Sequence, residues 1–139
     1  MPYTDKYREQ HVELAALATD VRKSADALRT EADCASVRGD LSRLAGKLMV
    51  HLSMEDKVMY PRLSEHADAS LRATADSFAS EMGGIAGAFT AYSAKWTASA
   101  IKADMAGFGK ETRAVMEVLL GRIQRENTTL YPLVDRHFA

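Results

Sequence analysis

Residues 51–61, HLSMEDKVMYP, recur 71 positions later as residues 122–132, RIQRENTTLYP. Glu, Tyr and Pro occupy the same places in both copies. The same shift places His11 on Met82 and Leu14 on Ile85. A proline late in a helix removes a backbone donor, and we expect each copy to bend or end its helix at the proline. The repeat predicts two pseudo-symmetric αα-hairpins.

Apolar residues recur with a helical period along the rest of the chain. Steps of three and four residues alternate, which is the pattern of the seam in a left-handed helical bundle. The predicted core positions are His11, Leu14, Ala18, Val21, Ala25 and Leu28; Leu41, Leu44, Leu48, His51, Glu55 and Val58; Leu71, Ala75, Phe78, Met82, Ile85, Phe89, Tyr92 and Trp96; and Phe108, Thr112, Val115, Leu119, Arg122, Glu126, Thr129 and Leu133.

The four periodic segments are separated by short breaks near residues 33–36, 65–68 and 99–104. Helix two is expected to begin at Ala35 or Ser36, and helix four to be capped by Ser99 or Asp104. Short links make successive helices antiparallel. The sequence therefore predicts an all-α protein, an antiparallel up-down-up-down four-helix bundle that forms one domain over residues 1–139.

Composition excludes several classes of protein. The chain has 139 residues, of which 47% are hydrophobic and 27% charged, as in an ordinary globular domain. A net charge of −1 argues against nucleic-acid binding. No stretch approaches the roughly 20 apolar residues of a membrane span, and the N-terminus has no apolar signal segment. Cys34 is the single cysteine, so we expect no intrachain disulfide and a cytoplasmic location.

Five histidines or charged residues lie on the predicted core stripe: His11, His51, Glu55, Arg122 and Glu126. Burying one unpaired charge costs several kcal/mol, so a group of them must be compensated locally. His51 and Glu55 are four residues apart on one helix face and can reach one metal ion. His11 supplies a second nitrogen and Glu126 a second carboxylate. Two nitrogens and two oxygens suit iron, manganese or zinc.

With these residues the chain resembles the hemerythrin-like, HHE-type cation-binding domains. Members carry one His on helix one, His-x-x-x-Glu on helix two, one His on helix three and His-x-x-x-Glu on helix four. These residues hold two bridged irons that bind oxygen or report on redox state. The resemblance covers essentially the whole chain, including the Tyr-Pro after each Glu, and it implies metal ligation by His11, His51, Glu55 and Glu126. The chain departs from the pattern at Met82 and Arg122.

The two departures fall on positions that supply nitrogen ligands to one metal ion in the family pattern. The residues found there can compensate for the loss of that ion. Arg122 brings a permanent cation to the place of the second metal, and its guanidinium is expected to clamp Glu55 and Glu126. Met82 is a flexible apolar residue that fills the other vacated space. Two alternatives stay open: one iron or other divalent ion in the remaining half-site, or no metal and a cluster held together by ion pairs.

Two functions follow from these alternatives. The first is a domain that senses or binds a small species, such as oxygen, nitric oxide or a redox signal, through at most one metal ion. The second is a metal-free helical adaptor that binds a partner protein through helix three, whose candidate contact residues are Gly83, Gly84, Phe89, Tyr92 and Trp96. An enzymatic role comes third, because the sequence reveals no substrate pocket, and no oligomeric state is predicted.

Overall fold

The computed structural model describes residues 2–138, apart from the side chain of Met82. Its first half contains α1 (Asp5–Asp26), α2 (Glu31–Met54), the helical turn η1 (Glu55–Met59) and α3 (Tyr60–Ser64). Its second half contains α4 (Ala69–Met82), α5 (Ile85–Lys95), α6 (Ala98–Ala103), α7 (Met105–Arg125), the turn η2 (Glu126–Leu130) and α8 (Tyr131–His137). No strand occurs between residues 2 and 138.

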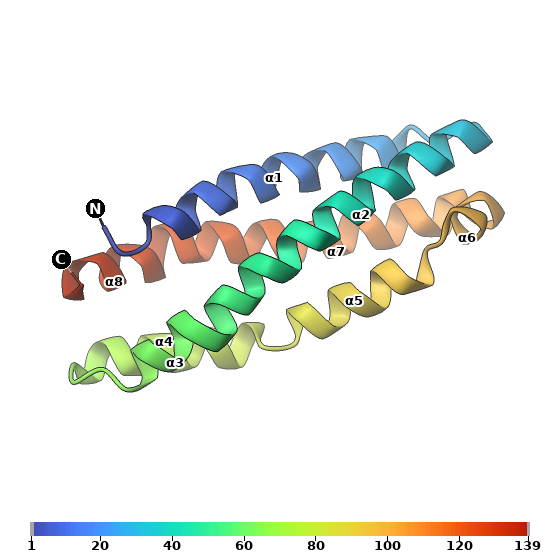
Figure 1. The fold of residues 1–139 in the computed structure, drawn as a ribbon. Helices are drawn as coiled ribbons and strands as arrows, with labels where there is room; N and C mark the ends of the chain where they lie inside the picture. The colour runs from blue at the N-terminus through green and yellow to red at the C-terminus, as the bar shows by residue number, and fades with distance from the viewer. Residues whose placement is uncertain (1, 139) are drawn as a thin grey trace.

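These elements form four rods that alternate in direction, as Figure 1 shows. The rods are α1, then α2 with η1 and α3, then α4 with α5, and finally α7 with η2 and α8. The short helix α6 forms the corner before the last rod. Helix α1 packs against both α2 and α7, and α5 packs against α2. The predicted all-α up-down-up-down bundle is therefore confirmed.

Helix two begins earlier than the sequence analysis predicts. The cap is Thr30, whose side chain accepts a hydrogen bond from the backbone N–H of Asp33, while the Asp33 carboxylate accepts one from the N–H of Thr30. This reciprocal capping box satisfies two N–H groups that would otherwise lack partners. The predicted start at Ala35 or Ser36 is wrong because both residues lie inside the helix.

The break predicted at residues 65–68 is found, whereas most of the break predicted at residues 99–104 is the short helix α6. Asp68 caps α4 by accepting from the N–H of Leu71. Asp104 caps α7 by accepting from the N–H of Gly107, as predicted. Ser99 caps no helix; it lies within α6, which Thr97 caps instead.

Helix three is interrupted at Gly83 and Gly84, which separate α4 from α5. A Cβ added at Gly84 or Gly87 would meet nothing within 4 Å. Gly84 and Gly87 are therefore not points of close helix packing. At Gly83 an added Cβ would lie 2.9 Å from the carbonyl oxygen of Ala79, so a side chain there would collide with the helix's own backbone.

Both long helices that end in Tyr-Pro contain a π-helical turn just before it. The N–H of Tyr60 bonds to the carbonyl of Glu55, and that of Tyr131 to the carbonyl of Glu126, five residues back in each case. Such turns hold one residue more than an α-helical turn and occur often at functional sites. They relieve the crowding that a proline causes within a helix, so each helix continues past its proline.

The extra residue moves the buried stripe by one position, starting within each π turn. Val58 and Thr129 were predicted to be core residues, yet Val58 is 56% exposed and Thr129 is exposed as well. Their successors, Met59 and Leu130, are completely buried. Beyond η2, Val134 is buried and the predicted Leu133 is only half-buried. These core predictions fail because they assume a constant helical period.

The core consists of two apolar clusters with a polar layer between them. The larger cluster fills the end of the bundle that carries the α1–α2 link and α6. The smaller cluster joins Tyr7 with residues of η1, α3, α4, η2 and α8 at the end where both termini lie. Among the described helices, none combines the length and hydropathy that a membrane crossing requires.

Thr30→Ala should lower the free energy of unfolding by about 1 kcal/mol, because the N-terminus of α2 loses its cap. Ser36→Ala, at an exposed position inside α2, is the matched control and should change it by less than about 0.5 kcal/mol. Urea denaturation followed by circular dichroism measures both. Equal effects of the two substitutions would contradict the assignment of the cap.

Candidate metal centre

Four side chains of three rods meet in the polar layer of the bundle. His11 comes from the second turn of α1 and His51 from the last turn of α2, while Glu55 and Glu126 are the first residues of η1 and η2. All four are at most 2% exposed. Each offers one ligand atom, and these atoms lie within 4.8 Å of one another. The fold thus brings together the four residues that the sequence analysis singles out.

The two imidazoles face each other through their Nε2 atoms, which are 3.0 Å apart. The Oε1 atoms of both carboxylates point at the same place. Glu126 Oε1 is 3.2 Å and Glu55 Oε1 3.8 Å from His11 Nε2. Glu55 Oε1 also contacts His51 Nε2. Two nitrogens and two oxygens therefore converge on one small volume.

The outer nitrogen of each imidazole is hydrogen-bonded to an amide oxygen. His11 Nδ1 lies 2.7 Å from Asn127 Oδ1, and His51 Nδ1 lies 2.6 Å from Gln10 Oε1. Because an amide oxygen only accepts, each Nδ1 carries the proton. A neutral ring then turns the lone pair of Nε2 inward, as metal-ligating histidines do.

Acceptors outnumber donors inside the cluster. Glu55 Oε1 and Oε2 and Glu126 Oε1 are buried and accept no hydrogen bond from any residue that the structure describes. Buried carboxylate oxygens without donors are costly, and facing lone pairs repel each other. A cation between them removes both costs. The donor set and its geometry therefore fit a metal ion, and in its absence they fit a proton.

The pKa values agree with this excess of acceptors. Burial disfavours a charged imidazole, yet contacts with Glu126, Glu55 and Asn127 outweigh burial and raise the pKa of His11 to about 9. Burial, followed by the nearby Glu55, raises the pKa of Glu126 to about 7. Burial also opposes ionisation of Glu55, but contacts with Glu126 and both histidines hold its pKa well below the usual range. A metal ion that enters has to displace the protons held here.

Arg122 lies on the other side of the carboxylates and is only 3% exposed. Its Nη2 is 3.8 Å from Glu55 Oε2, and its Nε is 3.5 Å from Glu126 Oε2. These are ion-pair contacts, so the expected tight, bidentate hydrogen-bonded clamp does not form. Each carboxylate nonetheless divides its oxygens, with Oε1 directed to the histidines and Oε2 to the guanidinium.

A third carboxylate, which the sequence pattern does not indicate, lies beside Arg122. Asp56 Oδ1 lies 3.5 Å from Nη2 of Arg122, and the side chain is 39% exposed. Asp56 directly follows Glu55 in the π turn, where neighbouring side chains diverge less than in an α-helix because more residues share a turn. Three carboxylates and one guanidinium leave two negative charges, which one divalent cation neutralises.

Two tyrosines complete the polar layer at equivalent places of the repeat. The hydroxyl of Tyr60 donates to Glu126 Oε2 at 2.7 Å, and that of Tyr131 lies 3.2 Å from His11 Nε2. The Tyr131 ring stacks on the His11 ring with their centroids 5.1 Å apart. Burial, followed by the two glutamates, raises the pKa of both phenols far above the usual range, so both remain donors.

The structure does not describe one predicted side chain, and the two other histidines of the chain lie outside the cluster. Position 82 is the last residue of α4, but the side chain of Met82 is not among those described, so the prediction that it fills the vacated space stays a prediction. His66 and His137 pack against each other with ring centroids 5.4 Å apart, away from the metal cluster.

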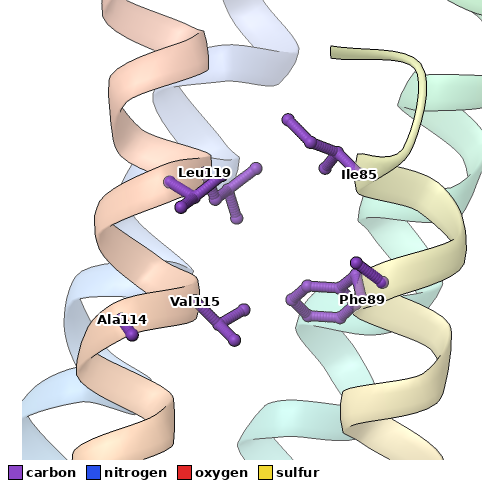
Figure 2. A pocket seen from close by; sticks show the side chains of 7 residues that line it. Ile85, Phe89, Ala114, Val115 and Leu119 are labelled. Carbon is purple, nitrogen blue, oxygen red and sulfur yellow. The ribbon is translucent and has the colours of Figure 1, made fainter. Parts of the chain in front are cut away.

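An apolar opening of about 210 Å³ lies between α5 and α7. Figure 2 shows Ile85 and Phe89 on α5 facing Val115 and Leu119 on α7 across it. A second opening shares Ile85 and Val118 with the first and reaches Arg122. Arg122 is therefore the residue of the polar layer that borders this opening.

Comparison with known proteins gives one result that bears on this site. The family model described as "Hemerythrin HHE cation binding domain" matches residues 3–134. No curated protein and no solved structure matches the chain. The match covers nearly all of the chain and includes every residue of the cluster. The chain therefore belongs to the hemerythrin HHE cation-binding domain family.

Proposed function

We propose that the protein binds one divalent metal ion through His11, His51, Glu55 and Glu126, and that it senses or binds a small species such as oxygen or nitric oxide at that ion. The observation that supports this most directly is the set of four buried acceptors converging on one point without a matching set of donors. Membership of a cation-binding family agrees with it.

Different residues of the chain would bind the ion, balance its charge and position its ligands. The two imidazoles, with their Nδ1 protons held by amide oxygens, present Nε2 to the ion. Glu55 and Glu126 present Oε1 and balance its charge, while Arg122 and Tyr60 hold the outer oxygens. Iron, manganese or zinc suits this donor set, and a bound iron would supply redox chemistry and open coordination positions for a small ligand.

A single ion is the stoichiometry that the charges support. Arg122 occupies the space on the Oε2 side of both carboxylates, and a second cation there would meet a permanent positive charge at close range. Position 122 also offers no lone pair, since a guanidinium only donates. We infer that Arg122 takes the place of a second metal ion.

A metal-free adaptor is the alternative. Phe89, Tyr92 and Trp96, which suggested a contact surface on helix three, are at most 5% exposed and pack in the core. A partner would instead use the apolar opening of Figure 2, next to Val118, which is 57% exposed. If the protein is an adaptor, it should contain no stoichiometric metal, and mutation of His51 should leave its binding to the partner unchanged.

Metal analysis of protein purified without an affinity tag, after growth with added iron, manganese or zinc, should give about one ion per chain. Glu55→Gln should reduce this to near zero, because the site loses a charged ligand. His66→Ala removes a histidine outside the cluster and should leave the content unchanged. Content near zero for every metal in the wild type would refute the proposal, and content near two would refute the role of Arg122.

Arg122→Ala should lower the free energy of unfolding of the metal-free protein by about 3–5 kcal/mol, because two buried carboxylates lose their permanent counter-charge. Arg125→Ala is the matched control on the same helix. Arg125 is 51% exposed and pairs with Glu81 at the surface, so its loss should cost less than about 1 kcal/mol. Urea denaturation measures both, and similar small losses would contradict the role of Arg122.

A further inference from the structure

The histidines of the cluster are oriented by residues that no motif identifies. Gln10 lies on α1, next to His11 in the chain, yet its amide oxygen accepts from His51 on α2. Asn127 follows Glu126 in η2, yet its amide oxygen accepts from His11 on α1. Each imidazole is thus held from a different helix, and both outer contacts are short.

The orientation of the Gln10 amide is itself fixed. Its Nε2 donates to the sulfur of Met54 at 3.3 Å, which leaves Oε1 to face His51. Asn127 is placed by the π turn, which directs two consecutive side chains, Glu126 and Asn127, toward the cluster. Its backbone carbonyl also accepts from Arg8 at 3.3 Å, which ties the turn to α1.

The repeat supports a specific role for Gln10 and Asn127. The shift of 71 residues places Gln10 on Glu81 and Asn127 on Asp56, and both of these are acceptors as well. The two acceptors that face imidazoles, Gln10 and Asn127, are neutral amides. Their counterparts in the repeat face arginines and are carboxylates: Asp56 pairs with Arg122 and Glu81 with Arg125.

The choice of an amide has a chemical reason. An amide oxygen accepts the Nδ1 proton and fixes the tautomer without adding charge. We propose that Gln10 and Asn127 are positioning residues for the metal centre: they hold the Nδ1–H form and the ring angle of His51 and His11, so that both Nε2 lone pairs point inward. The expected effect on metal affinity rests on the proposed function. The expected effect on the orientation and tautomer of the rings does not.

The test measures each ring and the metal separately. In ¹⁵N-labelled protein, nuclear magnetic resonance should show a slowly exchanging Nδ1 proton on both His11 and His51, in the metal-free and the zinc-loaded protein alike. Asn127→Ala should expose the proton of His11 to exchange and leave that of His51 unchanged, while Gln10→Ala should do the reverse. A merely structural role would disturb both rings together.

Zinc affinity, measured by competition with a chromophoric chelator, should fall about 10–100-fold in each alanine variant. Asn127→Asp and Gln10→Glu keep an acceptor and should restore the protected proton and an affinity at least that of the wild type. Glu9→Ala and Gln124→Ala, at exposed neighbouring positions, are the controls and should match the wild type. If an alanine variant does not fold, the corresponding serine variant replaces it, since serine also withdraws the amide.

Unchanged Nδ1 exchange in the alanine variants would overturn the inference, as would zinc affinities within about twofold of the wild type. A wild type that binds no zinc, iron or manganese would instead refute the proposed function. In that case, if each alanine variant lost protection of only one Nδ1 proton, the positioning roles would still be supported. If neither variant showed this selective loss, the positioning roles would be overturned as well.

Discussion

Two carboxylates, Glu55 and Glu126, are completely buried in the middle of a helical bundle, and the surrounding structure compensates for their charge. Burying an ionised carboxylate without partners costs several kcal/mol. Compensation comes from two sides: the guanidinium of Arg122 faces Oε2, and a proton or metal ion held between the Oε1 atoms and the imidazole nitrogens balances the other side. The apolar core is divided into two clusters because this charged layer lies between them.

The fold and the inner residues of the centre are accessible from the sequence because both depend on helical periodicity. Charged residues on an otherwise apolar stripe stand out, and this is how Glu55, Glu126 and Arg122 were found. Burial of Arg122 beside both glutamates follows from the same pattern. The start of α2 was missed because its cap, Thr30, precedes the break that the apolar pattern suggested.

The outer residues of the centre could not be found in this way. Gln10, Asp56 and Asn127 lie off the apolar stripe and resemble ordinary surface residues in the sequence. Their contacts depend on which neighbouring helix they face and on the π turns. The hydrophobic period of the sequence indicates neither of these. One signal was available: aligning the two halves places Gln10 on Glu81 and Asn127 on Asp56, so that acceptors flank the ligand positions in both copies.

The π turns also matter for the design of such a centre in another helical protein. Glu55 and Glu126 each begin a turn that holds one extra residue, and Asp56, Asn127 and Tyr131, which contact their partners in the centre, lie within or directly after these turns. A regular α-helical scaffold given the same His and Glu residues would present these three side chains in other directions. A designer who grafts the four ligands has to graft two helical insertions with them.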